Sequence, residues 1–308
     1  MPFALVYHEG YDLHLGTHIF PSTKYKLVRA RILREGIAAP EDFVEPEAAS
    51  EEQLTLVHTP EWVRKLASGE LSYHEILQLE IPYSRPTVRA FWYAAGGTIL
   101  TSRLALAHGV AVNIGGGFHH AFPDHGEGFC AINDIAVAIR VLQQEKRIER
   151  ALVVDCDVHH GNGTAAIFSG DDSVFTLSIH QLNNYPAVKP PSTLDIHLPD
   201  GVTDVEYLHH LRDPVHAAVS VFRPDLMIYV AGADPYYEDQ LGGLCLTIEG
   251  LLARDRFVLE TALAYKVPTA VVLAGGYALQ LADTVSIHAN TVRAAKEALA
   301  ETGWRSSR

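Results

Sequence analysis

The chain has 308 residues, and its 24 Lys or Arg against 37 Asp or Glu give a formal net charge of −13. A chain of this length buries a large core without disulfides, and 48% apolar residues exclude a disordered, collagen-like or coiled-coil protein. The acidity, without any basic run, argues against a nucleic-acid or anionic-membrane surface. The 17 histidines are unusual and indicate metal or proton chemistry.

Cysteine usage and the N-terminal segment bear on where the protein resides. The 3 cysteines form no C-x-x-C pair, which favours a reducing compartment. The opening MPFALVYHEG lacks the cationic region and apolar stretch of a signal peptide. No apolar run approaches the roughly 20 residues of a membrane span. We therefore expect a cytoplasmic protein that does not associate with a membrane.

Short β-branched segments alternate along the chain with longer helical patterns. Several of these segments are continuous apolar runs, which are typical of parallel strands covered on both faces. The alternation predicts an α/β fold with a single open, mostly parallel sheet of about eight strands and helices on both faces. The predicted strands are Phe3–Tyr7, Gln53–Val57, Val110–Ile114, Ala151–Asp155, Val174–Ile179, Asp225–Val230 and Thr269–Ala274. The predicted helices are Lys24–Arg34, Thr87–Ala107, Ile132–Gln144, Val205–Val221, Leu246–Ala264 and Ser286–Ala300.

No internal repeat and no Ser/Gly-rich linker divides the sequence. We therefore expect one domain over residues 1–308, with only about 302–308 as a flexible, dispensable tail.

Polar residues gather where five of the predicted strands end. Ligands of open α/β sheets bind beyond the carboxyl ends of the strands, so we expect these side chains to share one rim. The five segments are Gly115-Gly116-Gly117-Phe118-His119-His120, Cys156-Asp157-Val158-His159-His160, His180, Ala231-Gly232-Ala233-Asp234 and Gly275-Gly276-Tyr277.

A D-x-D-x-H run begins at Asp155, the end of a predicted strand. In an extended backbone Asp155, Asp157 and His159 point to one side, because side chains alternate, and Cys156 points to the other. We interpret Cys156 as a small buried apolar residue. Asp157, His159 and Asp234 are candidate ligands of one zinc ion, and three protein ligands leave a position open for water, as in catalytic sites. Any one of these residues alone is more often a cap or a core residue, but the combination favours a metal.

Four further features of the sequence bear on this possible site. His119-His120 follows a triple-glycine turn, and two imidazoles there can hold and transfer protons. His209-His210 lies in a helical pattern and is interpreted as a surface feature. Tyr277 can donate a hydrogen bond to a carbonyl oxygen, although Gly-Gly-Tyr alone is more often an ordinary turn. Asp195-Ile196-His197 repeats the D-x-H spacing but is interpreted as structural.

Nucleotide-binding and serine-hydrolase signatures are absent from the sequence: it contains no G-x-G-x-x-G after the glycine turn, no G-x-x-x-x-G-K-[ST] and no G-x-S-x-G.

Together these motifs resemble the zinc-dependent histone deacetylase family, within the arginase/deacetylase fold. The resemblance spans nearly the whole chain and is closest to class IV, on the compact Asn113–Cys130 segment, the entry from His18 to Tyr25, and Asn162, where class I members usually carry Asp. The motifs that carry it are Val57-His58-Thr59-Pro60-Glu61, Gly116-Gly117-Phe118-His119-His120-Ala121, Gly128-Phe129-Cys130-Ala131-Ile132-Asn133-Asp134, Asp155-Cys156-Asp157-Val158-His159-His160-Gly161-Asn162-Gly163, Ser178-Ile179-His180, Gly232-Ala233-Asp234-Pro235 and Gly275-Gly276-Tyr277.

The resemblance implies a role for each matching position. Zinc is expected on Asp157, His159 and Asp234. The expected catalytic residues are His120 as general base, His119 as its proton-transfer partner, Tyr277 at the oxyanion, Asp155 behind His119 and Asn162 behind His120. A monovalent cation, usually potassium, is expected on Asp155, Asp157, His159, Ser178 and Ile179. Gly128, Phe129 and Leu241 are expected to line an acyl-lysine tunnel.

The expected activity is removal of acetyl or longer acyl groups from lysine side chains of proteins or peptides. Asn162 is neutral, so it stabilises an imidazolium less than a carboxylate does, and we expect a less basic His120. Leu241 stands where a polyamine-selective member carries Glu, but Glu238 and Asp239 are close, so a small acylated amine such as an acetylpolyamine stays open as the substrate. A two-metal ureohydrolase and a catalytically silent acyl-lysine binder are further alternatives. Oligomeric state is not predicted.

Overall fold

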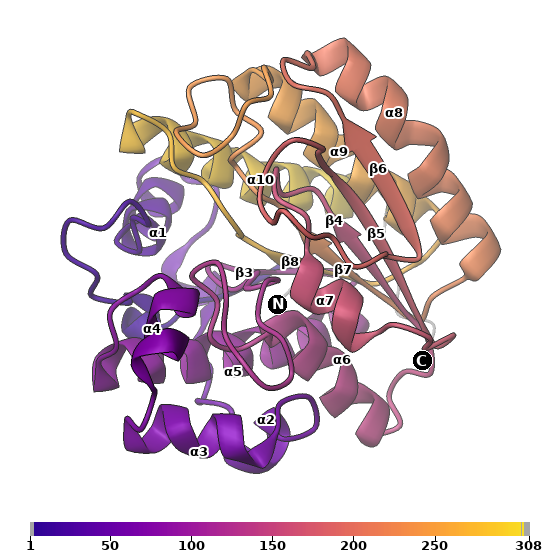
Figure 1. Ribbon diagram of the computed structural model, residues 1–308. Helices are drawn as coiled ribbons and strands as arrows, with labels where there is room; N and C mark the ends of the chain where they lie inside the picture. Colours follow the sequence, from indigo (N-terminus) through magenta and orange to yellow (C-terminus); the bar gives the residue numbers. More distant parts are fainter. Residues whose placement is uncertain (1–2, 303, 305–308) are drawn as a thin grey trace.

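The computed structural model describes residues 3–302 and residue 304 (Figure 1). Within them, eight strands form one parallel sheet with the order β2-β1-β3-β8-β7-β4-β5-β6, which confirms the predicted α/β fold. The strands are β1 Ala4–Val6, β2 Phe43–Val44, β3 Val110–Asn113, β4 Ala151–Asp155, β5 Val174–Gln181, β6 Leu194–Leu198, β7 Leu226–Val230 and β8 Thr269–Val272.

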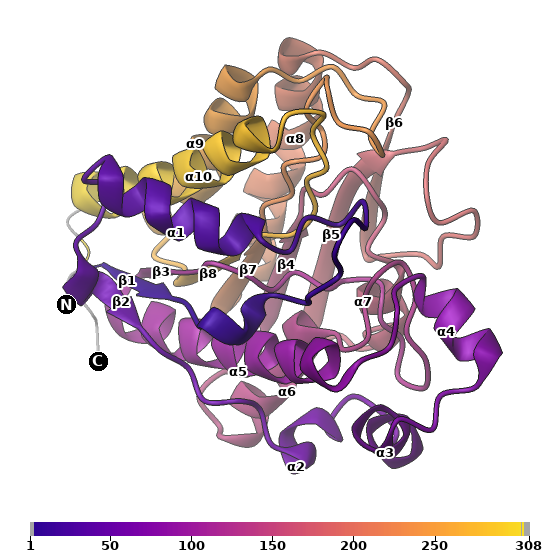
Figure 2. The same cartoon turned by 90° about the vertical axis from the view of Figure 1, so that its left-hand side faces the viewer.

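Helices cover both faces of the sheet, as Figure 2 shows. Helices α1, α9 and α10 pack together on one face, while α5 and α6 pack together on the other. The helices are α1 Lys24–Arg34, α2 Glu51–Leu54, α3 Pro60–Ser68, α4 Tyr73–Leu79, α5 Arg85–His108, α6 Asp134–Gln144, α7 Asn162–Ile167, α8 Asp204–Ala217, α9 Ile248–Ala264 and α10 Leu281–Thr302, with short turns at Glu9–Tyr11 and Pro40–Asp42 and a π-helical turn at Ala218–Phe222.

The core lies between the sheet and these two helical layers. Residues Ala151–Asp155 of β4 and Leu226–Val230 of β7 are buried along their whole length, as expected for central parallel strands. Because all the strands are parallel, their carboxyl ends meet at one edge of the sheet. The five strands whose ends carry the polar motifs, β3, β8, β7, β4 and β5, are consecutive in the sheet.

One predicted strand is wrong. Residues Gln53–Val57 do not join the sheet, since Glu51–Leu54 form helix α2 and the chain turns after it. Ser50 begins this helix by accepting a hydrogen bond from the Gln53 N–H, while the Gln53 side chain accepts one from the Ser50 N–H. This capping box provides hydrogen-bond acceptors for the N–H groups of Ser50 and Gln53. It stabilises the helix more than the β-branched residues of the segment favour a strand.

The structure also contains elements that the sequence pattern did not predict: strands β2 and β6 and helices α2, α3, α4 and α7. The predicted tail about 302–308 lies largely outside the described residues, but Thr302 ends α10 and Trp304 packs against the core. Over the residues described, every helix is too short or too polar to pass through a lipid bilayer.

Candidate active site

Three candidate metal ligands converge beyond the ends of β4 and β7. Strand β4 ends at Asp155, so the extended backbone expected through residue 159 stops early. Even so, one donor atom each from Asp157, His159 and Asp234 lies within 4.8 Å of the other two. His159 Nδ1 is 3.0 Å from Asp157 Oδ1 and 3.5 Å from Asp234 Oδ2. All three side chains are buried.

The chemistry of this donor set fits a divalent cation. Asp157 Oδ2 accepts a hydrogen bond from the Gly275 N–H at 2.9 Å, and Asp234 Oδ1 accepts one from the Val158 N–H at 2.9 Å. Asp234 Oδ2 makes no hydrogen bond within the described residues, although it is buried. Burial and the neighbouring Asp157 carboxylate raise the pKa of Asp234. Buried carboxylates are ordinarily paired or bound to a metal, so an imidazole and two carboxylates form a site that suits zinc.

Glycines make room for this cluster. A Cβ atom built on Gly275 would lie 1.8 Å from Asp234 Oδ2 and 2.6 Å from Asp157 Oδ2. Only a residue without a side chain brings the turn after β8 this close to the carboxylates. The turn after β3 likewise uses Gly117 at φ 85°, where an added Cβ would lie 2.7 Å from the Ala274 Cβ.

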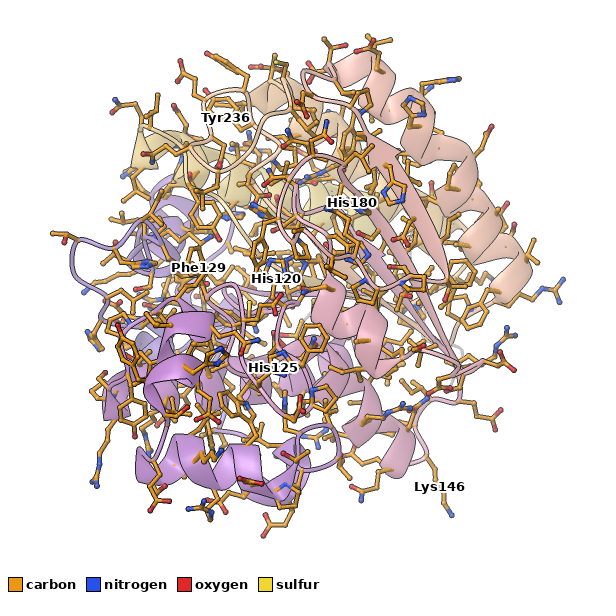
Figure 3. All side chains as sticks on the ribbon, in the orientation of Figure 1. His120, His125, Phe129, Lys146, His180 and Tyr236 are labelled. Carbon is orange, nitrogen blue, oxygen red and sulfur yellow. The ribbon has the colours of Figure 1, made fainter. Side chains whose placement is uncertain are left out.

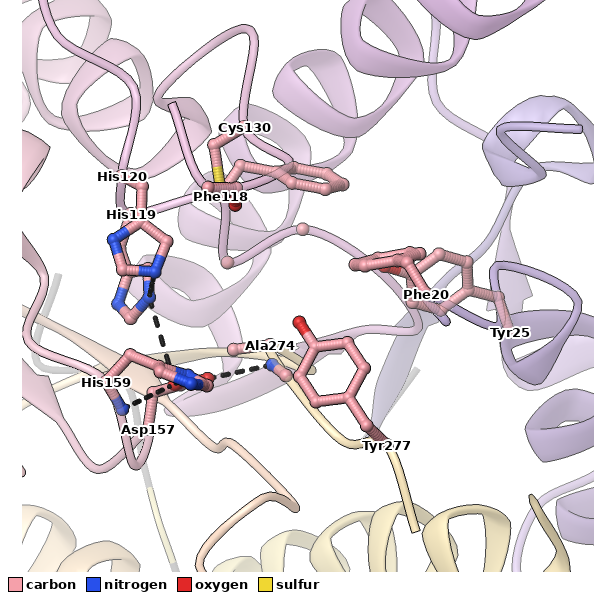
Figure 4. A pocket seen from close by; sticks show the side chains of 14 residues that line it. Phe20, Tyr25, Phe118, His119, His120, Cys130, Asp157, His159, Ala274 and Tyr277 are labelled. Carbon is pink, nitrogen blue, oxygen red and sulfur yellow. Dashed lines mark hydrogen bonds and ion pairs between the residues drawn. The ribbon is translucent and has the colours of Figure 1, made fainter. Parts of the chain in front are cut away.

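The imidazoles of His119 and His120 face each other beside the metal ligands, with their Nε2 atoms 3.1 Å apart (Figure 4). His119 Nδ1 donates to Asp155 Oδ2 at 2.7 Å, and His120 Nδ1 donates to Asn162 Oδ1 at 2.7 Å. With both Nδ1 atoms bonded outward, the contact between the two Nε2 atoms holds a single proton. The pair can therefore store a proton at one Nε2 and accept one at the other.

The pKa values of the two imidazoles are shifted in opposite directions. Burial acts to lower the pKa of His119, but the carboxylates of Asp155 and Asp157 outweigh it and raise that pKa. Burial, followed by the neighbouring His119 and His159 imidazoles, lowers the pKa of His120. The shared proton is therefore held by His119, which leaves His120 neutral.

Tyr277 lies opposite the imidazoles, and its hydroxyl points into the pocket (Figure 4). The pocket is lined by both imidazoles, Asp157, His159 and Tyr277. The Asp239 carboxylate holds the Tyr277 turn by accepting a hydrogen bond from the Tyr277 N–H at 2.6 Å. Burial raises the pKa of Tyr277, so the phenol stays protonated and can donate a hydrogen bond.

A cavity of about 200 Å³ leads from this pocket toward the surface. Phe129 and His120 both line this cavity, and Figure 3 shows His120 near the centre of the view with Phe129 to its left. The cavity reaches His159 among the candidate metal ligands and His120 of the imidazole pair. Its lining comprises Glu80, His120, Gly128, Phe129, His159, Asn184, Tyr185, Leu241 and Tyr277.

The residues expected to hold potassium lie at the neighbouring ends of β4 and β5. Asp155 is paired in register with Ser178, and Ile179 follows on β5. Asp155 Oδ1 accepts from the Asp157 N–H at 3.1 Å, and Ser178 Oγ is 2.9 Å from His180 Nδ1. The geometry brings these residues together, and the ion itself stays a prediction.

A second group of possible metal donors, His160, His180 and Asp195, also lies within 4.8 Å. It includes Asp195, the first residue of the D-x-H motif that was interpreted as structural, and this motif lies on β6. His160 Nε2 is bonded to Asp195 Oδ1 at 3.1 Å, and both ring nitrogens of His180 are bonded, to Ser178 and to His197. Of the donor atoms in this group, only His160 Nδ1 lacks a hydrogen-bond partner among the described residues. Asp195 and His197 are both bonded within the fold, so the structural interpretation of these two residues is retained.

Sequence reasoning missed several residues of the site. Lys24 is completely buried and donates from Nζ to the Ala274 carbonyl at 2.6 Å. Glu127 bonds the Asn162 side chain, and Glu80, Asn184 and Tyr185 line the cavity. These residues reach the site from distant segments of the chain, and no local sequence motif identifies them. Lys24 lies in the His18–Tyr25 segment that contributes to the family resemblance, but the sequence assigned it no role.

Comparisons with known proteins show which family shares this sequence and fold. The sequence model described as "Histone deacetylase domain" matches residues 18–292. The chain belongs to the histone deacetylase family. This confirms the resemblance seen in the sequence and indicates a deacetylase hydrolase that acts on acetylated substrates. The likeness to class IV in particular stays a prediction.

Relatives of the chain extend over most of its length. An uncharacterized protein of Picosynechococcus sp. is 43% identical over 302 residues, covering 96% of this chain and 99% of that protein. Histone deacetylase 2 of Arabidopsis thaliana is 31% identical over 287 residues, covering 89% and 74%. The acetoin utilization protein AcuC of Staphylococcus aureus is 29% identical over 283 residues, covering 84% and 72%.

Among solved structures, the HDA15 HD domain superposes with a TM-score of 0.82 at 24% identity, covering 97% of this chain and 91% of that one. At this level of identity the match is evidence for the fold, and it confirms the expected arginase/deacetylase architecture.

Proposed function

We propose that this histone deacetylase family member is a zinc-dependent hydrolase that removes acyl groups from lysine side chains. The observation that carries the proposal is the buried cluster of Asp157, His159 and Asp234 beside the His119–His120 pair, at the inner end of the cavity. Zinc bound there would polarise the amide carbonyl and lower the pKa of a water molecule to roughly 7.

The protein residues then handle the protons and the substrate. His120 accepts a proton at Nε2 as water adds to the amide carbonyl carbon, and its Nδ1–H stays bonded to Asn162. The C–N bond breaks as a proton passes from the imidazole pair to the departing amine. Tyr277 donates its hydroxyl proton in a hydrogen bond to the carbonyl oxygen, where negative charge develops. The products are a carboxylic acid and a free lysine.

The cavity suits an alkyl chain that ends in an amide. Phe129 and Tyr185 present aromatic walls to the cavity, and the Tyr185 ring centroid is 4.9 Å from the His120 ring centroid. Gly128 and Leu241 complete an apolar passage, so a lysine side chain can pass while its backbone stays outside. We infer a potassium ion at Asp155 and Ser178, where it would support the Asp157 loop. Class IV specificity, with acyl groups longer than acetyl, belongs to the same proposal, as does action in the cytoplasm.

A small acylated amine is the second candidate substrate, because Glu80 lines the cavity. Its carboxylate can bind a second ammonium group of such a substrate. Asp239 is one of two acidic residues, with Glu238, that the sequence left open for this role. It is less suited because its oxygens accept hydrogen bonds from the N–H groups of Leu241, Gly242 and Tyr277.

Hydrolysis of lysine peptides with acyl groups of graded length, compared with acetylpolyamines, tests the proposal. We expect zinc-dependent release of acid from at least one acyl-lysine peptide, and loss of turnover in His120→Ala. A zinc-loaded protein that binds these peptides without hydrolysing any of them would instead support a catalytically silent binder. Two metal ions per chain with urea release would support the ureohydrolase alternative.

A further inference from the structure

Glu127 lies behind Asn162, on the side away from the imidazole pair. Its Oε1 atom accepts a hydrogen bond from Asn162 Nδ2 at 2.5 Å. The Glu127 side chain is 18% exposed, and its Oε2 atom is 3.8 Å from His125 Nε2. Burial acts to raise the pKa of Glu127, but its interactions with His125, Asn162 and Tyr185 outweigh burial, so the pKa lies below its usual value. The group is therefore an anion at neutral pH.

An anionic carboxylate determines which way the Asn162 amide faces. A carboxylate can only accept hydrogen bonds, so the NH₂ group of Asn162 must point at Glu127. The amide oxygen then points at His120, where Oδ1 lies 2.7 Å from Nδ1. An amide oxygen can also only accept, so His120 Nδ1 must carry the hydrogen. The lone pair of the neutral ring is then on Nε2, which lies 3.1 Å from His119 Nε2 at the wall of the pocket.

Without the carboxylate, the amide would lose this directional constraint. A half-turn about its Cβ–Cγ bond would present NH₂ to His120 and stabilise the opposite tautomer, with hydrogen on Nε2. Asn162 is 2% exposed, so water offers little compensation for the missing partner. A ring with Nε2–H has no lone pair with which to accept a proton in the pocket.

We propose that Glu127 is a positioning residue that, through Asn162, fixes the His120 tautomer in which Nε2 carries the lone pair that accepts a proton. This inference rests on the proposed function for its consequence in catalysis, while the tautomer itself is a property of the folded chain. The contact with Glu127 also explains why a neutral residue occupies position 162. An Asp at that position would bring a second carboxylate against Glu127 at the 2.5 Å contact.

The test substitutes Glu127 and Asn162 singly and together. Glu127→Gln keeps the size of the side chain but lets either end of the amide at 162 face it. We expect kcat to fall by about 10-fold or more with a smaller change in KM, since a positioned base typically contributes ~10²–10⁴-fold. Adding Asn162→Asp should restore much of the lost kcat, because a carboxylate accepts from His120 Nδ1 in any orientation. Asn162→Asp alone should be less active than this double variant, owing to repulsion between like charges.

A direct readout is ¹⁵N NMR of the zinc-loaded protein with labelled histidine, the His120 signals being assigned by their loss in His120→Ala. Wild type should show hydrogen on Nδ1, and Glu127→Gln should show a population with hydrogen on Nε2. Glu127→Asp, which keeps the charge, should stay closer to wild type than Glu127→Gln. Tyr185→Phe removes a hydroxyl that helps to lower the pKa of Glu127 and leaves the contact between Glu127 and Asn162 in place. It should leave the His120 tautomer unchanged.

An unchanged tautomer in folded Glu127→Gln would overturn the inference, as would a double variant no more active than Glu127→Gln. A changed tautomer with unchanged kcat would overturn its catalytic part. If the wild-type protein hydrolyses no acyl-lysine peptide, the proposed function fails, and the tautomer measurement still decides whether Glu127 positions His120.

Discussion

Gly275 lies directly against the Asp234 carboxylate, so that a Cβ atom at residue 275 would lie 1.8 Å from Oδ2. Its N–H also donates to Asp157 Oδ2 at 2.9 Å. We expect Gly275→Ala to push the carboxylates apart and to lower zinc affinity and kcat/KM by about 100-fold or more, since even modest disturbance of metal-site geometry has effects of 10–100-fold. Zinc content after dialysis and peptide hydrolysis measure both effects.

Gly201→Ala is the matched control for this substitution. Gly201 has φ 76° and no other group within 4 Å of an added Cβ. The control therefore introduces backbone strain of about 1 kcal/mol without contact with the site. It should keep its zinc, and a loss of zinc equal to that of Gly275→Ala would show that general destabilisation is the cause.

Asp234→Asn should have opposite effects on zinc binding and on the stability of the metal-free protein. The neutral amide is a poor zinc ligand, so zinc binding and hydrolysis should be lost. The same change removes repulsion between the buried Asp234 and Asp157 carboxylates, whose proximity raises the pKa of Asp234. Chelator-treated Asp234→Asn should therefore be more stable than chelator-treated wild type, by on the order of 1 kcal/mol. Urea unfolding of both proteins in excess chelator gives the comparison, and a less stable variant would contradict it.

Tyr277→Phe tests the hydrogen bond to the reacting carbonyl oxygen. The substitution removes the hydroxyl and leaves the ring, and the Tyr277 N–H keeps its bond to Asp239. We expect kcat to fall by about 10²–10³-fold while zinc content and thermal stability stay near wild type. Turnover within a few-fold of wild type would remove Tyr277 from the mechanism.

His58 should make the fold sensitive to acid. Its Nδ1 donates to the Phe122 carbonyl at 2.9 Å, and its Nε2 accepts from the Asn133 N–H at 3.0 Å, so the ring must be neutral. Burial lowers the pKa of His58 to about 4. The unfolded state, with a pKa near 6.5, binds more protons between these values, so stability falls as pH drops below about 6.5.

The expected loss from His58 is about 2 kcal/mol of unfolding free energy between pH 6.5 and pH 5. His58→Gln, which cannot titrate, should lose correspondingly less over that interval. His14→Gln, at an exposed ring, should behave like wild type. Urea unfolding at several pH values measures the slopes, and equal slopes for wild type and His58→Gln would exclude His58 as the cause.

The central strands and the metal ligands were predictable from the sequence because their signals are local. Strands β4 and β7 are continuous apolar runs, and each leads directly into the polar residues of the site. Asp157 and His159 share one short motif, and the topology of a parallel sheet brings Asp234 to the same edge. Helix α1 was predicted over Lys24–Arg34, the range that the structure shows.

The elements and residues that were not predicted have weaker sequence signals or depend on contacts between distant parts of the chain. Strand β6, Leu194–Leu198, is a short edge strand that is only partly buried, and β2 spans only Phe43–Val44. The capping pairs Ser50 with Gln53 and Ser72 with Glu75 were present in the sequence and mark helices α2 and α4. Glu127 could not be identified in this way, because its partner Asn162 is 35 residues away and reaches it only in the folded chain.

The most direct test of the account is a crystal of the protein grown with zinc and measured at the zinc absorption edge. We expect one strong anomalous peak at about 2.0–2.2 Å from donor atoms of Asp157, His159 and Asp234, with one coordination position open toward the cavity. A peak elsewhere with none at these three residues, or a zinc ion enclosed entirely by protein ligands, would contradict the proposed hydrolase.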